Sequence, residues 1–359
     1  MSRDPGLIVI KIGTHVITKP SGLPDPSLIA SISQQVVALK AVGYSVVLVS
    51  SGAVASGQNI FQGGEIKDPI QRRQVLSALG QVDLMMRYRE QMAKGGIQCA
   101  QVLVTKEDFK DRTHYLNMKN CIQALIGNGI VPIVNENDVV SITELMFTDN
   151  DELAGLVSTM VNASKLIILT SVDGIFDRDP SDPAAQLIRV FNHHRVVEGG
   201  FVAGKKSAFG RGGILTKCQT AVKISGMGIP VHIANGRTEG ILAALLEGAE
   251  QPPGTFFPAG KSTSSIKKYV AQATETNGKL TINGGAEAAL RSTTAKSLLP
   301  VGVTQVVGQF KKGDVVRIEG EHGQEIGLGL ARVDSEKARS VMGINGEKPL
   351  IHYDYLYLH

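Results

Sequence analysis

Lysines and glycines stand together at two places where a phosphate group could bind. Lys11 lies inside the aliphatic run LIVIKIGTHVI and is followed two residues later by Gly13, and the segment GRGGILTK (210–217) ends in Lys217. A glycine lets the backbone approach a ligand closely. The free amides at the start of a helix, together with a lysine, attract an anion. Two such loops predict a site for a nucleotide triphosphate, although the chain has no G-x-x-x-x-G-K-[ST] motif and is therefore not a P-loop protein.

Acidic and amide side chains form a second group of candidates. The segments NENDVVS and FTDND contain Asn135, Asp138, Asn150 and Asp151. A carboxylate can bind an ammonium group, and an amide can bind either an ammonium or a carboxylate. These side chains predict a pocket for an amino acid. The DND triplet alone would also suit a metal ion, but no further cluster of ligands accompanies it, so we predict no metal held by the protein.

Each of these features also has an ordinary structural explanation. Lys11 could end a strand with its amine in solvent, and Lys217 could be a surface lysine. The segment SSGAVASG could be a simple strand-to-helix turn. The NEND and DND segments could be turn and helix-cap residues. The functional interpretation depends on all the segments occurring together and in this order.

The elements that must position these residues follow a βαβ rhythm. Short runs that are apolar throughout alternate with longer amphipathic segments, which is typical of a parallel sheet covered on both faces. Asp25 and Pro26 predict the start of a helix. We therefore predict an α/β fold with an open, mostly parallel sheet sandwiched by helices, whose ligands bind at the carboxyl ends of the strands. The predicted strands cover 7–12, 44–50, 97–105, 130–135 and 165–170, and the predicted helices cover 23–43, 70–94, 113–128 and 151–162.

The pattern changes near residue 259. The stretch QPPGTFFPAGKSTSSIKK is rich in Pro, Gly, Ser and Lys, as linkers often are. Short strand-like pieces broken by Gly and Asn follow it. We predict a main domain over 1–258, a linker over 259–274 and a small, mainly β domain over 275–359.

Composition narrows the classes of function. The chain has 359 residues and a formal net charge of +4, so neither nucleic acid nor a membrane surface is the expected main partner. No apolar stretch approaches the roughly 18 residues of a membrane span, and the first residues lack a signal-peptide pattern. Cys99, Cys121 and Cys218 show no metal or disulfide spacing. Free thiols and a cytoplasmic location are expected.

In chain order, several segments resemble the glutamate 5-kinase family of the amino acid kinase superfamily. They are VIKIGTHVI, VSSGAVASG, RRQVLSALGQVDLM, VPIVNENDVVS, FTDNDELAGLVS, LTSVDGIFDRDP and GRGGILTKCQTAVKISGMGIPVHIANG. The later segments GGAEAALRS and SLLPVGVTQVVGQFKKGDVV resemble a PUA domain. The resemblance covers nearly the whole chain. It implies the amino acid kinase fold and the ATP-dependent phosphorylation of glutamate to γ-glutamyl 5-phosphate in proline biosynthesis, with Mg²⁺ held mainly by the phosphates.

The resemblance also implies roles for individual residues. Lys11 and Lys217 would flank the transferred phosphoryl group, and Asp151 would orient both lysines. The glutamate site would comprise Ser51, Gly52, Asn135, Asp138 and Asn150. The nucleotide site would comprise Lys11, Gly13, Thr14, Thr170, Ser171, Arg211, Gly212, Gly213, Ile214, Leu215, Thr216 and Lys217.

Partners and alternatives follow from the same resemblance. It implies inhibition by proline at the glutamate pocket, a homo-oligomer, and transfer of the product to glutamyl phosphate reductase. The alternatives are a related kinase acting on N-acetylglutamate or aspartate, an RNA-binding protein acting through the PUA-like domain, and an inactive regulatory relative. The C-terminal residues 277–359 carry ten Lys and Arg against nine Asp and Glu, which is a weak electrostatic footprint for RNA.

Overall fold

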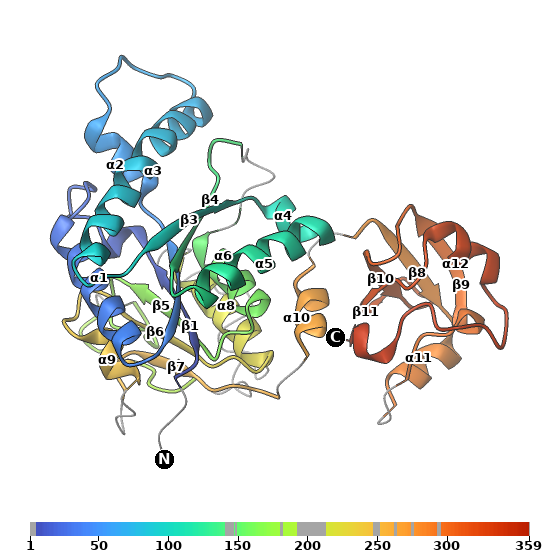
Figure 1. Cartoon of the computed structure of the whole chain (residues 1–359). Coiled ribbons are helices and arrows are strands. Elements are labelled where there is room, and N and C mark those ends of the chain that lie inside the picture. The colour runs from blue at the N-terminus through green and yellow to red at the C-terminus, as the bar shows by residue number, and fades with distance from the viewer. Residues whose placement is uncertain are drawn as a thin grey trace. The chain divides into compact units, whose positions relative to one another are not determined.

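The computed structural model describes most of the chain. The described residues are 5–140, 147, 149–179, 182–191, 213–246, 252–261, 264–273, 276–292 and 296–358. The chain divides into two compact units, one of residues 1–106 and 118–262 and one of residues 107–117 and 263–359 (Figure 1). We keep the limits 1–258, 259–274 and 275–359 as our proposal for the domains.

The first unit is built on a sheet with the strand order β3-β4-β2-β1-β5-β6-β7. Strand β1 is central, and all the strands are parallel except β7, which pairs antiparallel with β6. The predicted mostly parallel sheet is confirmed. Because the six parallel strands run the same way, the loops at their carboxyl ends share one edge of the sheet. The strands are β1 (Leu7–Ile12), β2 (Ser45–Ser50), β3 (Cys99–Val104), β4 (Val131–Glu136), β5 (Lys165–Thr170), β6 (Val231–Asn235) and β7 (Thr255–Phe257).

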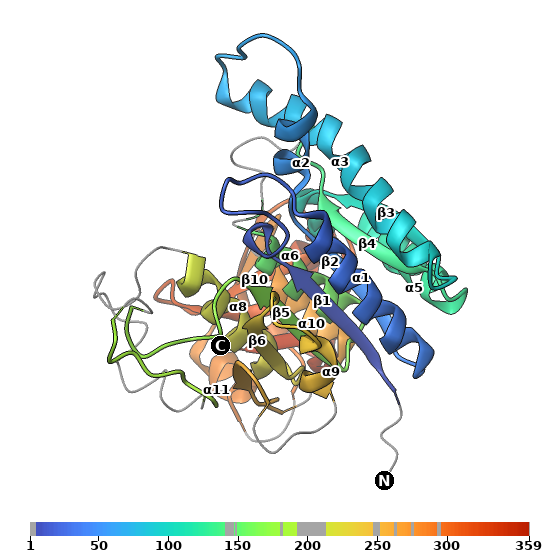
Figure 2. The same cartoon turned by 90° about the vertical axis from the view of Figure 1, so that its left-hand side faces the viewer.

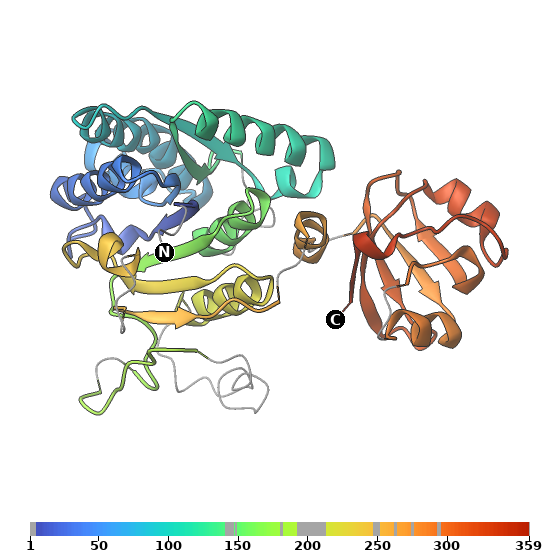
Figure 3. The ribbon, with the colours of Figure 1, turned by 60° about the horizontal axis from the view of Figure 1, so that its bottom comes forward.

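Helices cover both faces of this sheet (Figures 2 and 3). Side chains of α1, α3 and α9 form one buried cluster with Ile8, Ile10 and Ile12 of β1. Successive side chains of a strand point to opposite faces, so Lys11 points to the other face, where α6 packs across β1 and its neighbours. The helices of this unit are α1 (Pro26–Ala41), α2 (Ala53–Ile60), α3 (Pro69–Ala93), the part of α5 (Arg112–Gly127) from residue 118 onward, α6 (Asn150–Met160), α8 (Gly213–Gly226) and α9 (Ile241–Leu246), with a 3₁₀ turn η1 (Thr14–Val16). Nearly all of α4 (Lys106–Lys110) and the first residues of α5 belong to the second unit.

The predicted start of α1 is confirmed. The Asp25 side chain accepts a hydrogen bond from the backbone amide of Ser27 at 3.0 Å, and Pro26 occupies the first helical position. Among the described residues, no helix has the length and apolar character needed to cross a membrane.

Two glycines let α2 and α3 cross with their backbones in contact. A Cβ atom placed on Gly80 would lie 1.8 Å from the Ala53 carbonyl oxygen, and one on Gly57 would lie 1.9 Å from the Leu76 carbonyl oxygen. Real Cβ atoms do not approach backbone this closely, so any larger residue must push the helices apart. This crossing sets the position of α3 beside the carboxyl end of β2.

Gly80→Ala is therefore expected to lower the free energy of unfolding by about 3 kcal/mol, because the added methyl group overpacks a backbone contact. Urea unfolding measures the change. Gly127→Ala is the matched control, because a Cβ there meets no atom within 4 Å. A Gly80→Ala protein as stable as the Gly127→Ala protein would show that the helices do not need this contact.

His232 lies on β6 with its side chain buried. Its ring stacks on that of Phe256, with the ring centroids 4.5 Å apart. Burial lowers the pKa of His232 to about 4, and Lys165 adds to this effect. Between pH 6.5 and pH 4 the unfolded chain therefore takes up a proton that the folded chain does not. Stability falls as the pH falls through this window, by about 2 kcal/mol at pH 5 from this residue.

His232→Phe keeps the stacked ring and removes the titrating group. Urea unfolding at pH 7.5 and pH 5 should show a smaller loss of stability for this variant than for the parent chain. The exposed His322→Gln change should leave the parent's loss as it is. An equal loss in His232→Phe and the parent would refute this account.

The second unit contains a mixed sheet with the strand order β12-β11-β10-β8-β9 and its own apolar core. The predicted small, mainly β C-terminal domain is confirmed. The predicted linker contains a helix, α10 (Ser265–Gln272), which begins with a Ser264 side-chain cap. The other elements are β8 (Gly278–Ile282), α11 (Gly284–Leu290), η2 (Pro300–Gly302), β9 (Val303–Gly308), β10 (Val315–Glu319), β11 (Glu325–Leu330), α12 (Ser335–Val341), η3 (Tyr353–Tyr355) and β12 (Leu356–Leu358).

Candidate functional site

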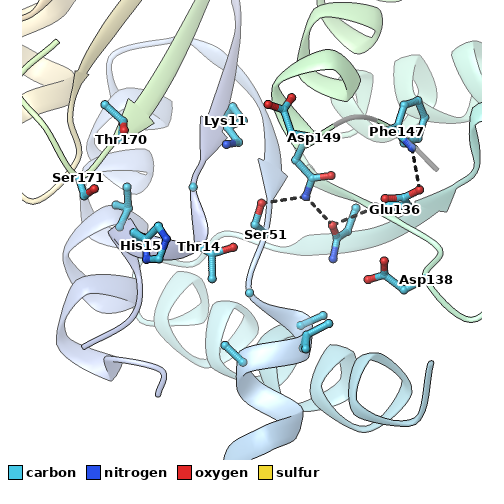
Figure 4. A pocket seen from close by; sticks show the side chains of 18 of the residues that line it. Lys11, Thr14, His15, Ser51, Glu136, Asp138, Phe147, Asp149, Thr170 and Ser171 are labelled. Atoms are coloured by element: carbon cyan, nitrogen blue, oxygen red, sulfur yellow. Dashed lines mark hydrogen bonds between the residues drawn. The ribbon is translucent and has the colours of Figure 1, made fainter. Parts of the chain in front are cut away.

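A cavity of about 380 Å³ opens at the carboxyl edge of the first sheet (Figure 4). Its volume is within the usual range for small-molecule sites. In Figure 4, Thr170 and Ser171 lie to one side of Lys11, while Glu136 and Asp138 lie to the other. The lining residues are Lys11, Gly13, Thr14, His15, Val16, Ser51, Gly52, Ala53, Val54, Ala55, Arg73, Asn135, Glu136, Asp138, Phe147, Asp149, Asn150, Thr170, Ser171 and Lys217.

Two lysines from distant parts of the chain share one carboxylate. Lys11 Nζ lies 2.6 Å from Asp151 Oδ1, and Lys217 Nζ lies 2.6 Å from Asp151 Oδ2. Lys11 comes from the end of β1, Asp151 from the first turn of α6, and Lys217 is the fifth residue of α8. Asp151 is fully buried, so it lies beneath the cavity and fixes both ammonium groups at the cavity wall.

Burial and charge set the protonation of this trio. Burial alone would raise the pKa of Asp151, but Lys11 and Lys217 outweigh it, and the pKa lies below its usual value. Burial lowers the pKa of Lys11, which Asp151 opposes and Lys217 reinforces. When both lysines are protonated, the two ammonium groups and the one carboxylate give the trio a net positive charge. Such a site favours an anionic ligand.

Asp149 connects the starts of α6 and α8. Its Oδ1 accepts hydrogen bonds from the backbone amides of Asp151 and Glu152 at 2.9 and 3.1 Å, which caps α6. Its Oδ2 accepts a hydrogen bond from the Thr216 hydroxyl at 2.6 Å. Through the first pair of bonds, Asp149 fixes the start of α6, which carries Asp151. Through the bond to Thr216, it holds the residue that precedes Lys217 in α8.

Amide and hydroxyl groups form a hydrogen-bonded chain on the other side of Lys11. Asn150 Nδ2 donates to Ser51 Oγ at 2.8 Å and to Asn135 Oδ1 at 3.0 Å. Asn135 Nδ2 donates to Gln81 Oε1 of α3 at 2.9 Å. These bonds hold Ser51, which directly follows β2, together with side chains from β4, α3 and α6 in one arrangement, which is suited to binding the polar groups of a small ligand.

Asp138 is bound on both oxygens by α3. Arg73 donates from Nη2 and Nε to Asp138 Oδ1 at 2.6 and 3.0 Å, and Ser77 Oγ donates to Oδ2 at 2.9 Å. The Arg73 Nη2 atom also lies 3.8 Å from a carboxylate oxygen of Glu136. The Asp138 carboxylate is therefore oriented by the protein and remains at the cavity wall, where it can meet a cationic group.

Two glycines shape the backbone next to the lysines. A Cβ on Gly13 would lie 3.6 Å from Lys11 Nζ and 3.2 Å from the Leu169 carbonyl oxygen. Gly52 precedes α2 with φ +106°, a conformation that favours glycine, and no side chain caps that helix start. The amides at the start of α2 therefore face the cavity without a capping side chain, as at anion sites.

Most of the predicted site residues meet at this cavity. Asp151 lies beneath it, and Ile214 and Thr216 of α8 do not line it. Gly213 begins α8, while Arg211, Gly212 and the Leu215 side chain lie outside the described residues. The predicted site residues that line the cavity are Lys11, Gly13, Thr14, Ser51, Gly52, Asn135, Asp138, Asn150, Thr170, Ser171 and Lys217.

Sequence reasoning missed the contribution of α3. Arg73, Ser77 and Gln81 recur every four residues, which places them on one face of a helix. That spacing of polar residues in RRQVLSALGQ was a usable signal. Asp149 and Glu136 were also not assigned, although both lie in the acidic segments. In the described part of the chain, no three His, Cys, Asp or Glu side chains gather as a metal site, and the three cysteines are free.

Comparison with known proteins matches both units. The model of the amino acid kinase family matches residues 6–235, and the model of the PUA domain matches residues 278–350. The glutamate 5-kinase of Bacteroides thetaiotaomicron is 44% identical over the full length of both chains. That of Chlorobaculum tepidum is 49% identical and covers 98% of this chain and 97% of its own.

A solved structure agrees on the fold of the first unit. The isopentenyl phosphate kinase of T. acidophilum superposes with a TM-score of 0.51 at 18% identity. The match covers 70% of this chain and 99% of that chain. At this identity the likeness concerns the fold alone.

Proposed function

This chain belongs to the amino acid kinase family, among the glutamate 5-kinases, and we propose that it transfers the γ-phosphoryl group of ATP to the side-chain carboxylate of L-glutamate. The product is γ-glutamyl 5-phosphate, the first intermediate of proline biosynthesis. The observation that carries the proposal is the buried Asp151 carboxylate bound by Lys11 and Lys217 at 2.6 Å each, beside a cavity that also contains Asp138 and Asn150.

The two sides of Lys11 suit the two substrates. We assign the nucleotide to the side of Thr170 and Ser171, and the amino acid to the side of Ser51 and Asp138. In this assignment Asp138 accepts the ammonium group of glutamate. The amide chain through Asn150 fixes the remaining polar groups.

The chemistry needs positioning more than proton transfer. A glutamate side chain has a reference pKa of about 4.3 and is already an ionised nucleophile at neutral pH, so no general base is required. Its attack on the triphosphate brings two anions together. Lys11 and Lys217 reduce their repulsion and stabilise the charge on the transferred group, while Asp151 holds both lysines in place.

We further propose that Mg²⁺ accompanies ATP and is held chiefly by phosphate oxygens and water. The carboxylates at the cavity already have partners in the protein: Asp138 binds Arg73 and Ser77, Asp149 caps α6 and binds Thr216, and Asp151 binds the two lysines. Mg²⁺ retains water readily and commonly binds through phosphates with few carboxylates. When bound, it would neutralise part of the phosphate charge.

A hydroxamate assay tests the function directly. Purified chain is incubated with ATP, Mg²⁺, hydroxylamine and either L-glutamate, N-acetylglutamate or L-aspartate. Glutamate should give by far the highest rate of hydroxamate formation. A preference for N-acetylglutamate or aspartate would replace this proposal with a related acyl-phosphate kinase, and no turnover with any of the three would reject it.

Asp138→Asn is expected to raise KM for glutamate by about 10-fold or more, with a smaller effect on kcat, because it removes the charge that pairs with the ammonium group. With its oxygen in the place of Oδ1, the asparagine can still accept from Arg73, while its NH₂ group can donate to the Ser77 hydroxyl. Steady-state kinetics at saturating ATP measure both constants. The exposed Asp334→Asn change in the second unit is the control. An unchanged KM for glutamate would remove Asp138 from the substrate site.

The proposed function also includes inhibition of the enzyme by proline and its assembly into an oligomer. We propose that proline competes with glutamate in the same pocket, that the product passes to glutamyl phosphate reductase, and that the enzyme works in the cytoplasm as a homo-oligomer. Assembly is supported by an exposed apolar stripe on α3 formed by Val75, Leu79, Val82 and Met86. Glutamate saturation curves with added proline and sedimentation equilibrium test the first and last points.

A further inference from the structure

The second unit contains its own cavity, of about 550 Å³. It is formed within residues 107–117 and 263–359 and is lined by Arg112, Lys312, Arg332 and His352, with one carboxylate, Asp354. Leu330 contributes to an otherwise largely apolar wall. Among the described residues, three basic side chains and one carboxylate therefore surround a single space.

These cations have no carboxylate partners in the described part of the chain. No ion pair involves Arg112, Lys312 or Arg332 there, whereas Asp354 lies 3.3 Å from His352 Nδ1. The neighbouring Asp314 accepts a hydrogen bond from the backbone amide of Lys311. Because the three basic side chains outnumber the one carboxylate among the described lining residues, the cavity has excess positive charge, which favours an anionic ligand.

The backbone of this cavity is shaped around one of the cations. Gly313 has φ +98°, a left-handed conformation that favours glycine, and a Cβ there would lie 3.1 Å from Arg112 Cδ. The stem of Arg112 thus packs directly over the loop that carries Lys312. This packing brings Arg112 next to the loop that carries Lys312, and both residues line the cavity.

We propose that this cavity binds a small phosphorylated molecule, with its phosphate on Arg112, Lys312 and Arg332 and its organic part against Leu330 and Tyr355. Arg and Lys are the usual phosphate partners, and the volume suits a small molecule. The near-balanced charge of residues 277–359 disfavours a long nucleic acid as the ligand.

The test titrates inorganic pyrophosphate into the full chain by calorimetry. Because the kinase cavity also attracts phosphate, the K217A variant is included to remove that contribution. In the K217A background, the double change K312Q/R332Q should weaken the remaining binding by at least about 10-fold. The control K337Q/K348Q changes two lysines of the same unit that do not line the cavity, and it should leave the affinity unchanged.

Asp354→Asn is a second variant, for which we expect the affinity for pyrophosphate to rise instead of fall. Asp354 is the one carboxylate among the described lining residues, so removing its charge should tighten pyrophosphate binding while leaving the cations in place. Equal affinity in the K217A chains with and without K312Q/R332Q, or no tightening with D354N, would overturn the proposal. Binding of a ten-nucleotide single-stranded RNA, lost in K312Q/R332Q, without measurable pyrophosphate binding would replace it with a nucleic-acid site.

Discussion

Replacing Lys11 or Lys217 by alanine is expected to lower kcat by about 10²- to 10³-fold, the usual cost of removing one group that stabilises charge in a transition state. Each ammonium group lies 2.6 Å from one oxygen of Asp151, Lys11 as an ion pair and Lys217 also as a hydrogen-bond donor, and both lysines line the cavity. Either change removes a positive charge from the place where two anions must meet. Initial rates at saturating glutamate and ATP measure the effect.

Lys223→Ala is the matched control for Lys217→Ala. Both lysines belong to α8, but Lys223 does not line the cavity, so its removal should leave kcat within about 2-fold of the parent. Circular dichroism checks that each variant is folded. A folded Lys11→Ala or Lys217→Ala chain with near-parental kcat would show that the lysines do not act on the transferred group.

Asp151→Asn is expected to lower both activity and stability. The carboxylate is fully buried, and the two lysines keep its pKa below the usual value, so it is ionised at neutral pH. Removing its charge leaves buried Lys11 beside Lys217 without a counter-charge. We expect the free energy of unfolding to fall by about 3 kcal/mol and kcat to fall by at least about 10²-fold, because neither lysine is held in position.

Glu152→Gln tests whether any carboxylate of α6 behaves in this way. Glu152 follows Asp151 directly but pairs with Lys106 at 3.4 Å in a partly exposed position. Such pairs contribute about 1 kcal/mol or less. Urea unfolding and kinetics of the two variants should therefore differ clearly, and similar losses in both would contradict the special role given to Asp151.

Much of the fold could be predicted because its signals are local. An apolar run without alternation indicates a strand covered on both faces, and the Asp25-Pro26 pair indicates a helix start, whatever the rest of the chain does. The helix α10 inside the predicted linker was missed because its short sequence is rich in Ser and Lys, and its Ser264 cap resembles ordinary loop composition.

The candidate site could be predicted only in part. Residue types and their order along the chain indicated phosphate-binding and amino-acid-binding loops and assigned Lys11, Asp151 and Lys217 to one site by family resemblance. The contribution of α3 to the site was not predicted from the residue types and their order. Arg73 and Ser77 reach Asp138 because Gly57 and Gly80 let α2 and α3 cross in backbone contact.

The amino-acid sequence by itself therefore determined the elements, the family and the chemical character of each loop, since these depend on neighbouring residues. Tertiary structure alone decided which side chains touch. Lys11 and Lys217 are far apart along the chain, and they meet at Asp151 because a parallel sheet with β1 at its centre brings the starts of α6 and α8 to one edge. The same holds for the cations of the second cavity, which packing gathers from separate segments.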